Sequence, residues 1–141
     1  MKKTDGLSFK PKVLVVEDTL IALKMAQMTL EEKGCEVVCA TSGEEALEKM
    51  DSSFNFVLMD IGLPGIDGFE TAKRIRKMGK KLYSIPIVVL TGHSDTKKYI
   101  EISKEIGLNG FLSKPFTLDM CNLLLNKFIF YKNDSNEFLI V

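Results

Sequence analysis

The chain has 141 residues, 45% of them hydrophobic, and its 19 basic and 19 acidic residues give a formal net charge of zero. This length fits one domain with a single core and leaves no room for a second, effector domain. The balanced charge gives no electrostatic reason to expect nucleic acid or an anionic membrane as a partner.

The N-terminal segment is basic but contains no apolar stretch, so it does not form a signal peptide. No apolar run approaches the roughly 20 residues that cross a membrane. The three cysteines, Cys35, Cys39 and Cys121, are odd in number and suit neither a disulfide framework nor a zinc site. We therefore expect reduced thiols, a cytoplasmic location and no contact with the membrane.

Strand and helix patterns alternate from the start of the chain. Lys12–Val16 is a short β-branched run, which is typical of a fully buried strand. Residues 20–33 carry a wide apolar face at helical spacing, so they predict a helix. Glu36–Ala40 predicts a second strand, and residues 42–50 predict a helix that begins with the spacing of a capping box.

The middle of the chain repeats this order. Phe56–Asp60 predicts a third buried strand, which is followed by a loop rich in glycine and proline. Asp67 is expected to cap the next helix, which ends near Gly79. Ile85–Leu90 predicts a fourth strand with a proline near its start, where a missing N–H is tolerated.

The last part of the chain adds one more pair of elements and a tail. Thr96–Ile106 predicts a helix, Gly110–Ser113 a very short fifth strand, and Thr117–Phe128 the last helix. The tail from Tyr131 onward has no predicted element. Its apolar end could pack on the domain, form a dimer contact or lead into a linker.

Five strand–helix repeats predict a parallel sheet with helices on both faces, which is a doubly wound α/β fold. The predicted domain covers residues 12–130, between an N-terminal extension of residues 1–11 and a tail of residues 131–141. In open sheets of this kind, the active crevice lies at the carboxyl ends of the strands.

Five polar residues follow or end four of the predicted strands. They are Glu17 and Asp18 after the first strand, Asp60 at the third, Thr91 at the fourth and Lys114 at the fifth. Three clustered carboxylates repel one another unless a cation lies among them, and oxygen ligands that share the ion with phosphate favour Mg²⁺. A carboxylate can attack phosphorus, so the pattern is typical of an aspartyl-phosphate site.

Four segments, VLVVED, FVLMDIGLPGIDGFE, IPIVVLTG and FLSKPF, together resemble bacterial response-regulator receiver domains over about residues 13–128. The resemblance implies a flavodoxin-like five-stranded sheet of order 2-1-3-4-5 with five helices. It implies that Asp60 is the phosphoacceptor and that Asp18, Asp60 and the backbone carbonyl of Gly62 bind Mg²⁺. Glu17 would act on the ion mostly through water.

The same resemblance implies a phosphoryl-binding pair and a conformational switch. Lys114, joined to Pro115 by a cis peptide bond, would bind the phosphoryl oxygens. Thr91 would move toward the phosphoryl group, and Phe111 would then rotate inward. This rotation would alter the face formed by the helix at 96–106, the strand after it and the last helix.

Some of these positions have a second interpretation. Phe111 is either the switch aromatic or ordinary core packing, and His93 is either a solvated loop residue or a modulator at the edge of the phosphoryl pocket. Gly62 is a second possible modulator, because it places no side chain over the site. A charged face on the helix at 96–106 is either solvated or a dimer contact.

The favoured function is a signalling phosphoacceptor and not an enzyme with a diffusible substrate, although self-phosphorylation and self-dephosphorylation are expected. Its donor would be a sensor histidine kinase or a histidine phosphotransfer domain, and its downstream protein is not readable from the sequence. The chain would be a monomer or a weak homodimer, and either a stand-alone regulator or the receiver of a hybrid kinase. Two alternatives remain: an unphosphorylated binding scaffold, and a Mg²⁺-dependent phosphohydrolase, which needs an acid where Gly62 stands.

Overall fold

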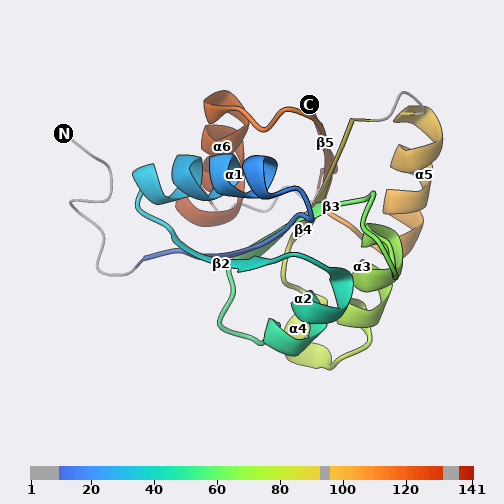
Figure 1. Cartoon of the computed structure of the whole chain (residues 1–141). Coiled ribbons are helices and arrows are strands. Elements are labelled where there is room, and N and C mark those ends of the chain that lie inside the picture. Colours follow the sequence, from blue (N-terminus) through green and yellow to red (C-terminus); the bar gives the residue numbers. More distant parts are fainter. Residues whose placement is uncertain (1–9, 93–95, 132–136) are drawn as a thin grey trace.

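The computed structural model describes residues 10–92, 96–131 and 137–141, and six strands of these residues form one parallel sheet (Figure 1). The strands are β1 (Lys12–Val16), β2 (Glu36–Ala40), β3 (Phe56–Asp60), β4 (Ile87–Thr91), β5 (Gly110–Ser113) and β6 (Leu139–Ile140). Their order across the sheet is β2-β1-β3-β4-β5-β6, and every neighbouring pair is parallel. The predicted order is confirmed for the first five strands.

The helices of the described residues are α1 (Leu20–Glu32), α2 (Gly43–Lys49), α3 (Gly68–Arg76), α4 (Lys80–Tyr83), α5 (Thr96–Ile106) and α6 (Leu118–Leu125). A five-residue π-helix, η2 (Asn126–Phe130), continues α6. Side-chain oxygens cap three helices as their sequences suggest. They are Ser42 at α2, Asp67 at α3 and Thr117 at α6, each accepting from a backbone N–H three residues later.

The prediction of five strands and five helices is wrong in two places. The tail contributes β6, a strand of two residues that is too short to show a period of its own. The four-residue α4 lies where a turn was expected, between the end of α3 and β4. A third, smaller difference is that β4 begins at Ile87, after Pro86, which has no N–H to donate.

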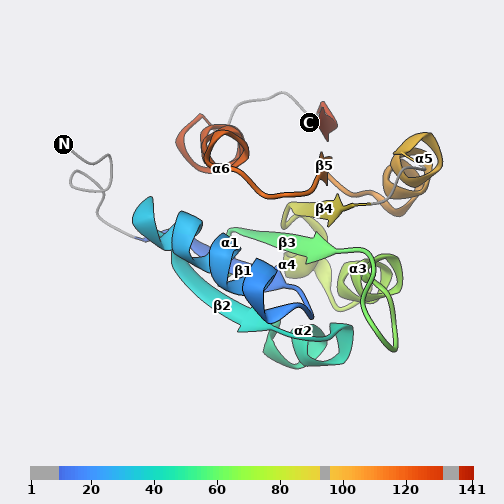
Figure 2. The same cartoon turned by 45° about the horizontal axis from the view of Figure 1, so that its top comes forward.

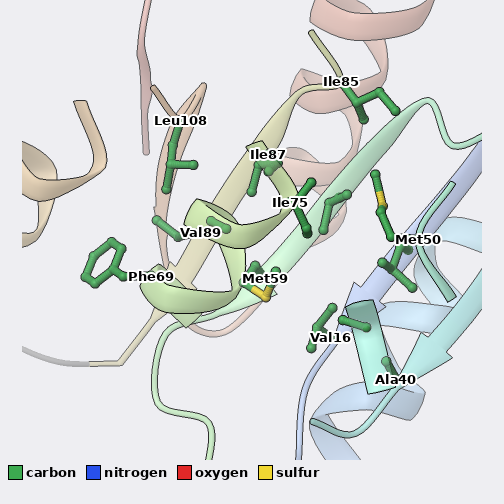
Figure 3. Packing of buried hydrophobic residues seen from close by; sticks show 14 of the residues in the cluster. Val16, Ala40, Met50, Met59, Phe69, Ile75, Ile85, Ile87, Val89 and Leu108 are labelled. Atoms are coloured by element: carbon green, nitrogen blue, oxygen red, sulfur yellow. The ribbon is translucent and has the colours of Figure 1, made fainter. Parts of the chain in front are cut away.

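The helices cover both faces of the sheet, as Figure 2 shows. One face packs against α1 and α6, in a cluster that includes Val13, Leu30 and Leu124. The opposite face packs against α2, α3, α4 and α5, in the cluster drawn in Figure 3. Alternate residues of each central strand therefore enter different cores, which fixes the register of the strands.

None of the helices in the described part of the chain is both long enough and apolar enough to cross a membrane.

Candidate functional site

Four strands bring the predicted site residues together at the carboxyl ends of the strands. Asp60 is the last residue of β3 and Thr91 the last of β4, whereas Glu17 and Lys114 directly follow β1 and β5. Carboxylate oxygens of Glu17, Asp18 and Asp60 lie within 4.8 Å of one another. The structure thus brings together all five residues that the strand ends predicted.

The lysine forms ion pairs with two of the three carboxylates. Lys114 Nζ lies 2.9 Å from Glu17 Oε1 and 3.4 Å from Asp60 Oδ1. The Glu17 and Asp60 side chains are 4% and 7% exposed, whereas the Lys114 side chain is 28% exposed. The second oxygen of Glu17 accepts a hydrogen bond from Thr19 N at 3.1 Å. The Lys114 side chain therefore extends from the surface to the nearly buried carboxylates.

The surroundings of Glu17 and Lys114 shift their pKa values. Burial raises the pKa of Glu17, and the charge of Asp60 adds to this, while hydrogen bonds from Lys114 and Thr19 oppose it. Burial alone would lower the pKa of Lys114, but the hydrogen bond to Glu17 and the charge of Asp60 raise it above its ordinary value. The lysine is therefore a stable cation, whereas Glu17 takes up a proton more readily than an exposed glutamate does.

A loop that folds back over the end of β3 frames Asp60. Gly62 N lies 3.4 Å from Asp60 Oδ1, so its amide faces the carboxylate. Gly68 N donates to Ile61 O at 2.9 Å, which closes the loop. A Cβ atom on Gly68 would lie only 2.2 Å from Asp60 O, so this position requires glycine. The sequence did not mark Gly68, because its need arises only from the path of the loop.

The predicted switch residues are both buried. Thr91 and Phe111 are each 1% exposed, and Phe111 belongs to the core on the side of α5. Phe111 is therefore buried in this structure, and its rotation on phosphorylation stays a prediction. The Lys114–Pro115 peptide bond is cis. His93, the possible modulator, lies outside the described residues.

A hollow of about 340 Å³ opens beside the carboxylates, between α1 and the segment that follows β5. Glu17, Asp60 and Lys114 line one part of it, and apolar side chains such as Met25 and Phe116 line the rest. Met25 is 56% exposed, so the apolar wall reaches the surface. The sequence alone does not reveal this hollow, because its walls come from segments far apart in the chain.

The donor set suits a hard divalent cation. Three carboxylates on two strand ends supply only oxygen ligands, and Mg²⁺ prefers one or two carboxylates with water and phosphate oxygens completing its shell. Lys114 supplies a second positive charge on the side of β5. A cation and an ammonium group around one nearly buried carboxylate are the parts that phosphoryl transfer to that carboxylate requires.

The response regulator receiver domain family model matches residues 13–125. The chain is 36% identical over 117 residues to the CAI-1 autoinducer sensor kinase/phosphatase CqsS of Vibrio cholerae, covering 82% of this chain and 16% of that protein. It is 33% identical over 136 residues to the osmosensing histidine protein kinase SLN1 of Saccharomyces cerevisiae, covering 91% of this chain and 11% of that protein. The chain therefore spans a small part of these relatives' length.

Solved structures show the same fold. The chemotaxis response regulator CheY4 of Vibrio cholerae superposes with a TM-score of 0.76 at 31% identity, covering 86% of this chain and 100% of that one. A response regulator receiver domain protein from Clostridium thermocellum gives a TM-score of 0.74 at 29% identity, covering 86% of this chain and 96% of that one.

Proposed function

Because the chain belongs to the response regulator receiver domain family of two-component signalling, we propose that Asp60 accepts a phosphoryl group from phosphohistidine with Mg²⁺ as the cofactor. The observation that carries this proposal is the position of Asp60. It ends a central strand, is 6% exposed, and has both an ammonium group and two further carboxylates beside it. Glu17 has the same neighbours, but its two oxygens already bind Lys114 Nζ and Thr19 N.

Asp18 and Asp60 would hold the ion with the backbone carbonyl of Gly62, and Glu17 would act on it through water. When bound, Mg²⁺ neutralises charge on the phosphoryl oxygens. An Asp60 oxygen forms the new bond to phosphorus as the phosphorus–nitrogen bond of phosphohistidine breaks, and the imidazole nitrogen keeps the electron pair. Lys114 then exchanges its contact with Glu17 for the phosphoryl oxygens.

The output of this reaction is a change on the α5–β5–α6 face. Thr91 and Phe111 belong to neighbouring strands, with Val89 opposite Phe111 and Thr91 opposite Ser113. A shift of the Thr91 hydroxyl toward the phosphoryl group would therefore act directly on the neighbouring strand β5. We assign this face to a downstream protein or to weak self-association, and His93 to the rate at which water removes the phosphoryl group.

The donor is a sensor histidine kinase or a histidine phosphotransfer domain, since the relatives include sensor and histidine kinases. The apolar wall beside Met25 supports this assignment, because it gives a donor protein a surface next to the carboxylates. We place the reaction in the cytoplasm and assign to the chain a slow self-phosphorylation from small donors and self-dephosphorylation. The domain that performs them spans residues 12–130.

The test is the intact mass of the protein after incubation with acetyl phosphate and Mg²⁺. We expect one added phosphoryl group in the wild type and in Asp51→Ala, a matched control at an exposed carboxylate. Asp60→Ala and a sample with EDTA should gain none. An adduct that forms without Asp60 would place the acceptor elsewhere. No adduct with acetyl phosphate, together with no binding of beryllofluoride, would favour the unphosphorylated scaffold.

A further inference from the structure

Residues 138–141 close the edge of the sheet beside β5. β6 runs parallel to β5, with Leu139 opposite Gly110 and Ile140 opposite Phe111. Backbone hydrogen bonds join Leu139 N to Asn109 O at 3.0 Å, Val141 N to Phe111 O at 3.0 Å, and Ser113 N to Val141 O at 3.1 Å. The segment therefore satisfies edge groups of β5 that would otherwise be open to another strand.

Side chains of the same segment enter both cores. Leu139 packs against the cluster under α1 and α6, and Phe138 packs against the opposite cluster. Lys104 Nζ, on α5, lies 5.6 Å from the centre of the Phe138 ring, a cation–π contact. A Cβ atom on Gly110 would lie 3.1 Å from both Leu139 Cβ and Leu139 O, so the missing side chain makes room for the strand. The edge of β5 is thus shaped for this occupant.

The segment lies close to the predicted switch residue Phe111 and to the lysine of the site. Ile140 stands across from Phe111, whose side chain is 1% exposed. Ser113, whose N–H binds the segment, immediately precedes Lys114, and Lys114 Nζ lies 3.4 Å from Asp60 Oδ1. The last hydrogen bond of the tail is therefore made by the residue directly before the lysine of the site.

We propose that residues 138–141 are an intramolecular ligand of the α5–β5–α6 face, and that their docking and the phosphorylation of Asp60 strengthen each other. The inference rests on the proposed function and on the predicted inward rotation of Phe111 after phosphorylation. The docked segment pairs with β5 opposite Phe111, and Phe111 is fully buried beside it, so docking favours a buried ring at this position. Coupling of this kind is reciprocal, because each ligand prefers the state that the other stabilises.

This coupling also defines what can bind the β5 edge from another protein. A competitor would have to supply a parallel strand with a large apolar side chain over Gly110, since that is the space Leu139 fills. It would act against the docked tail, so it would bind the unphosphorylated protein more readily.

The first test follows hydrogen exchange of the Leu139, Val141 and Ser113 amides by NMR in the full chain with Mg²⁺. Addition of beryllofluoride should slow their exchange by about fivefold or more, the lower end of typical coupling between sites. The amide of Gly62, which faces Asp60, reports independently that beryllofluoride is bound. Bound beryllofluoride with unchanged or faster exchange at the three amides would overturn the inference and leave the proposed function standing.

The second test compares Leu139→Ala with Leu123→Ala, the same change at a side chain on α6 that is 43% exposed. Leu139→Ala should lose protection at the Ser113 amide and bind beryllofluoride about fivefold more weakly. Leu123→Ala should match the wild type in both. Equal beryllofluoride affinity in the two variants would refute the coupling. If no protein binds beryllofluoride or takes a phosphoryl group, the proposed function fails, and the coupling fails with it.

Discussion

The site disfavours the ionised form of Glu17 when no metal ion is bound. Its side chain is 4% exposed, and burial and the charge of Asp60 raise its pKa above the ordinary value of 4.5. A group whose pKa is higher in the folded chain than in the unfolded chain adds stability that is complete below the unfolded pKa. That stability is lost as the pH rises through the folded pKa.

We therefore expect the free energy of unfolding, measured with urea in EDTA, to fall as the pH rises from about 4.5 toward neutrality. One proton contributes at most about 1.4 kcal/mol per pH unit. Glu17→Gln should remove this part of the slope, and Glu36→Gln, at an exposed position, should not. Saturating Mg²⁺ should reverse the trend, because the ion binds the ionised acids. Parallel pH curves for wild type and Glu17→Gln would contradict this account.

At the scale of elements, two contacts hold the two ends of α3 against neighbouring segments. The Arg76 guanidinium, at the end of α3, donates to Ile85 O at 2.8 Å and to Asn109 Oδ1 at 3.0 Å. The other contact is the close approach of Gly68, the first residue of α3, to Asp60 O. Arg76 thus ties α3 to the segments before β4 and β5, and Gly68 fixes the start of α3 against the acceptor strand.

Gly68→Ala should destabilise the fold by roughly 1–3 kcal/mol, because its Cβ would overlap the backbone of β3. The midpoint of urea unfolding measures this loss. Gly92→Ala is the matched control, since a Cβ atom there meets only Lys114 Cδ, at 3.9 Å. A Gly68→Ala protein as stable as Gly92→Ala would show that the loop after β3 moves aside without cost.

Element order and site were predictable because both depend on local patterns repeated along the chain. Apolar runs gave the first five strands, and parallel pairing then placed Asp60 and Lys114 at one edge. β6 was missed because two residues have no period, and α4 because a single turn of helix resembles any lysine-rich turn. The burial of Phe111 agrees with core packing, one of its two predicted interpretations, whereas its role in a switch stays a prediction.

At the scale of the whole molecule, two of the three thiols lie within one core. Cys35 and Cys121 are buried in the cluster beneath α1 and α6, and burial raises their pKa values to about 11 and about 12. Burial also raises the pKa of Cys39, which is only half-buried. Thiolates are the reactive form of cysteine, so the first two thiols are both neutral and covered.

Labelling with a thiol reagent at pH 8 should therefore modify Cys39 first. Cys35 and Cys121 should react together, at the rate of global unfolding, because exposing either one requires opening the same core. Peptide mass mapping over time separates the three sites, and added urea should accelerate the slow pair alone. Early modification of Cys121 would mean that α6 opens separately from the rest.

The direction of β6 has a practical consequence for labelling and fusion. Since all six strands are parallel, Lys10 lies at their amino ends and Val141 at their carboxyl ends. Asp60 also lies at the carboxyl ends. A fluorescent protein or affinity tag attached after Val141 would leave the sheet at the end of the strands that carries the site, next to Ser113. Lys10 lies at the opposite ends of the strands, so the amino side of the domain is the better place for a reporter.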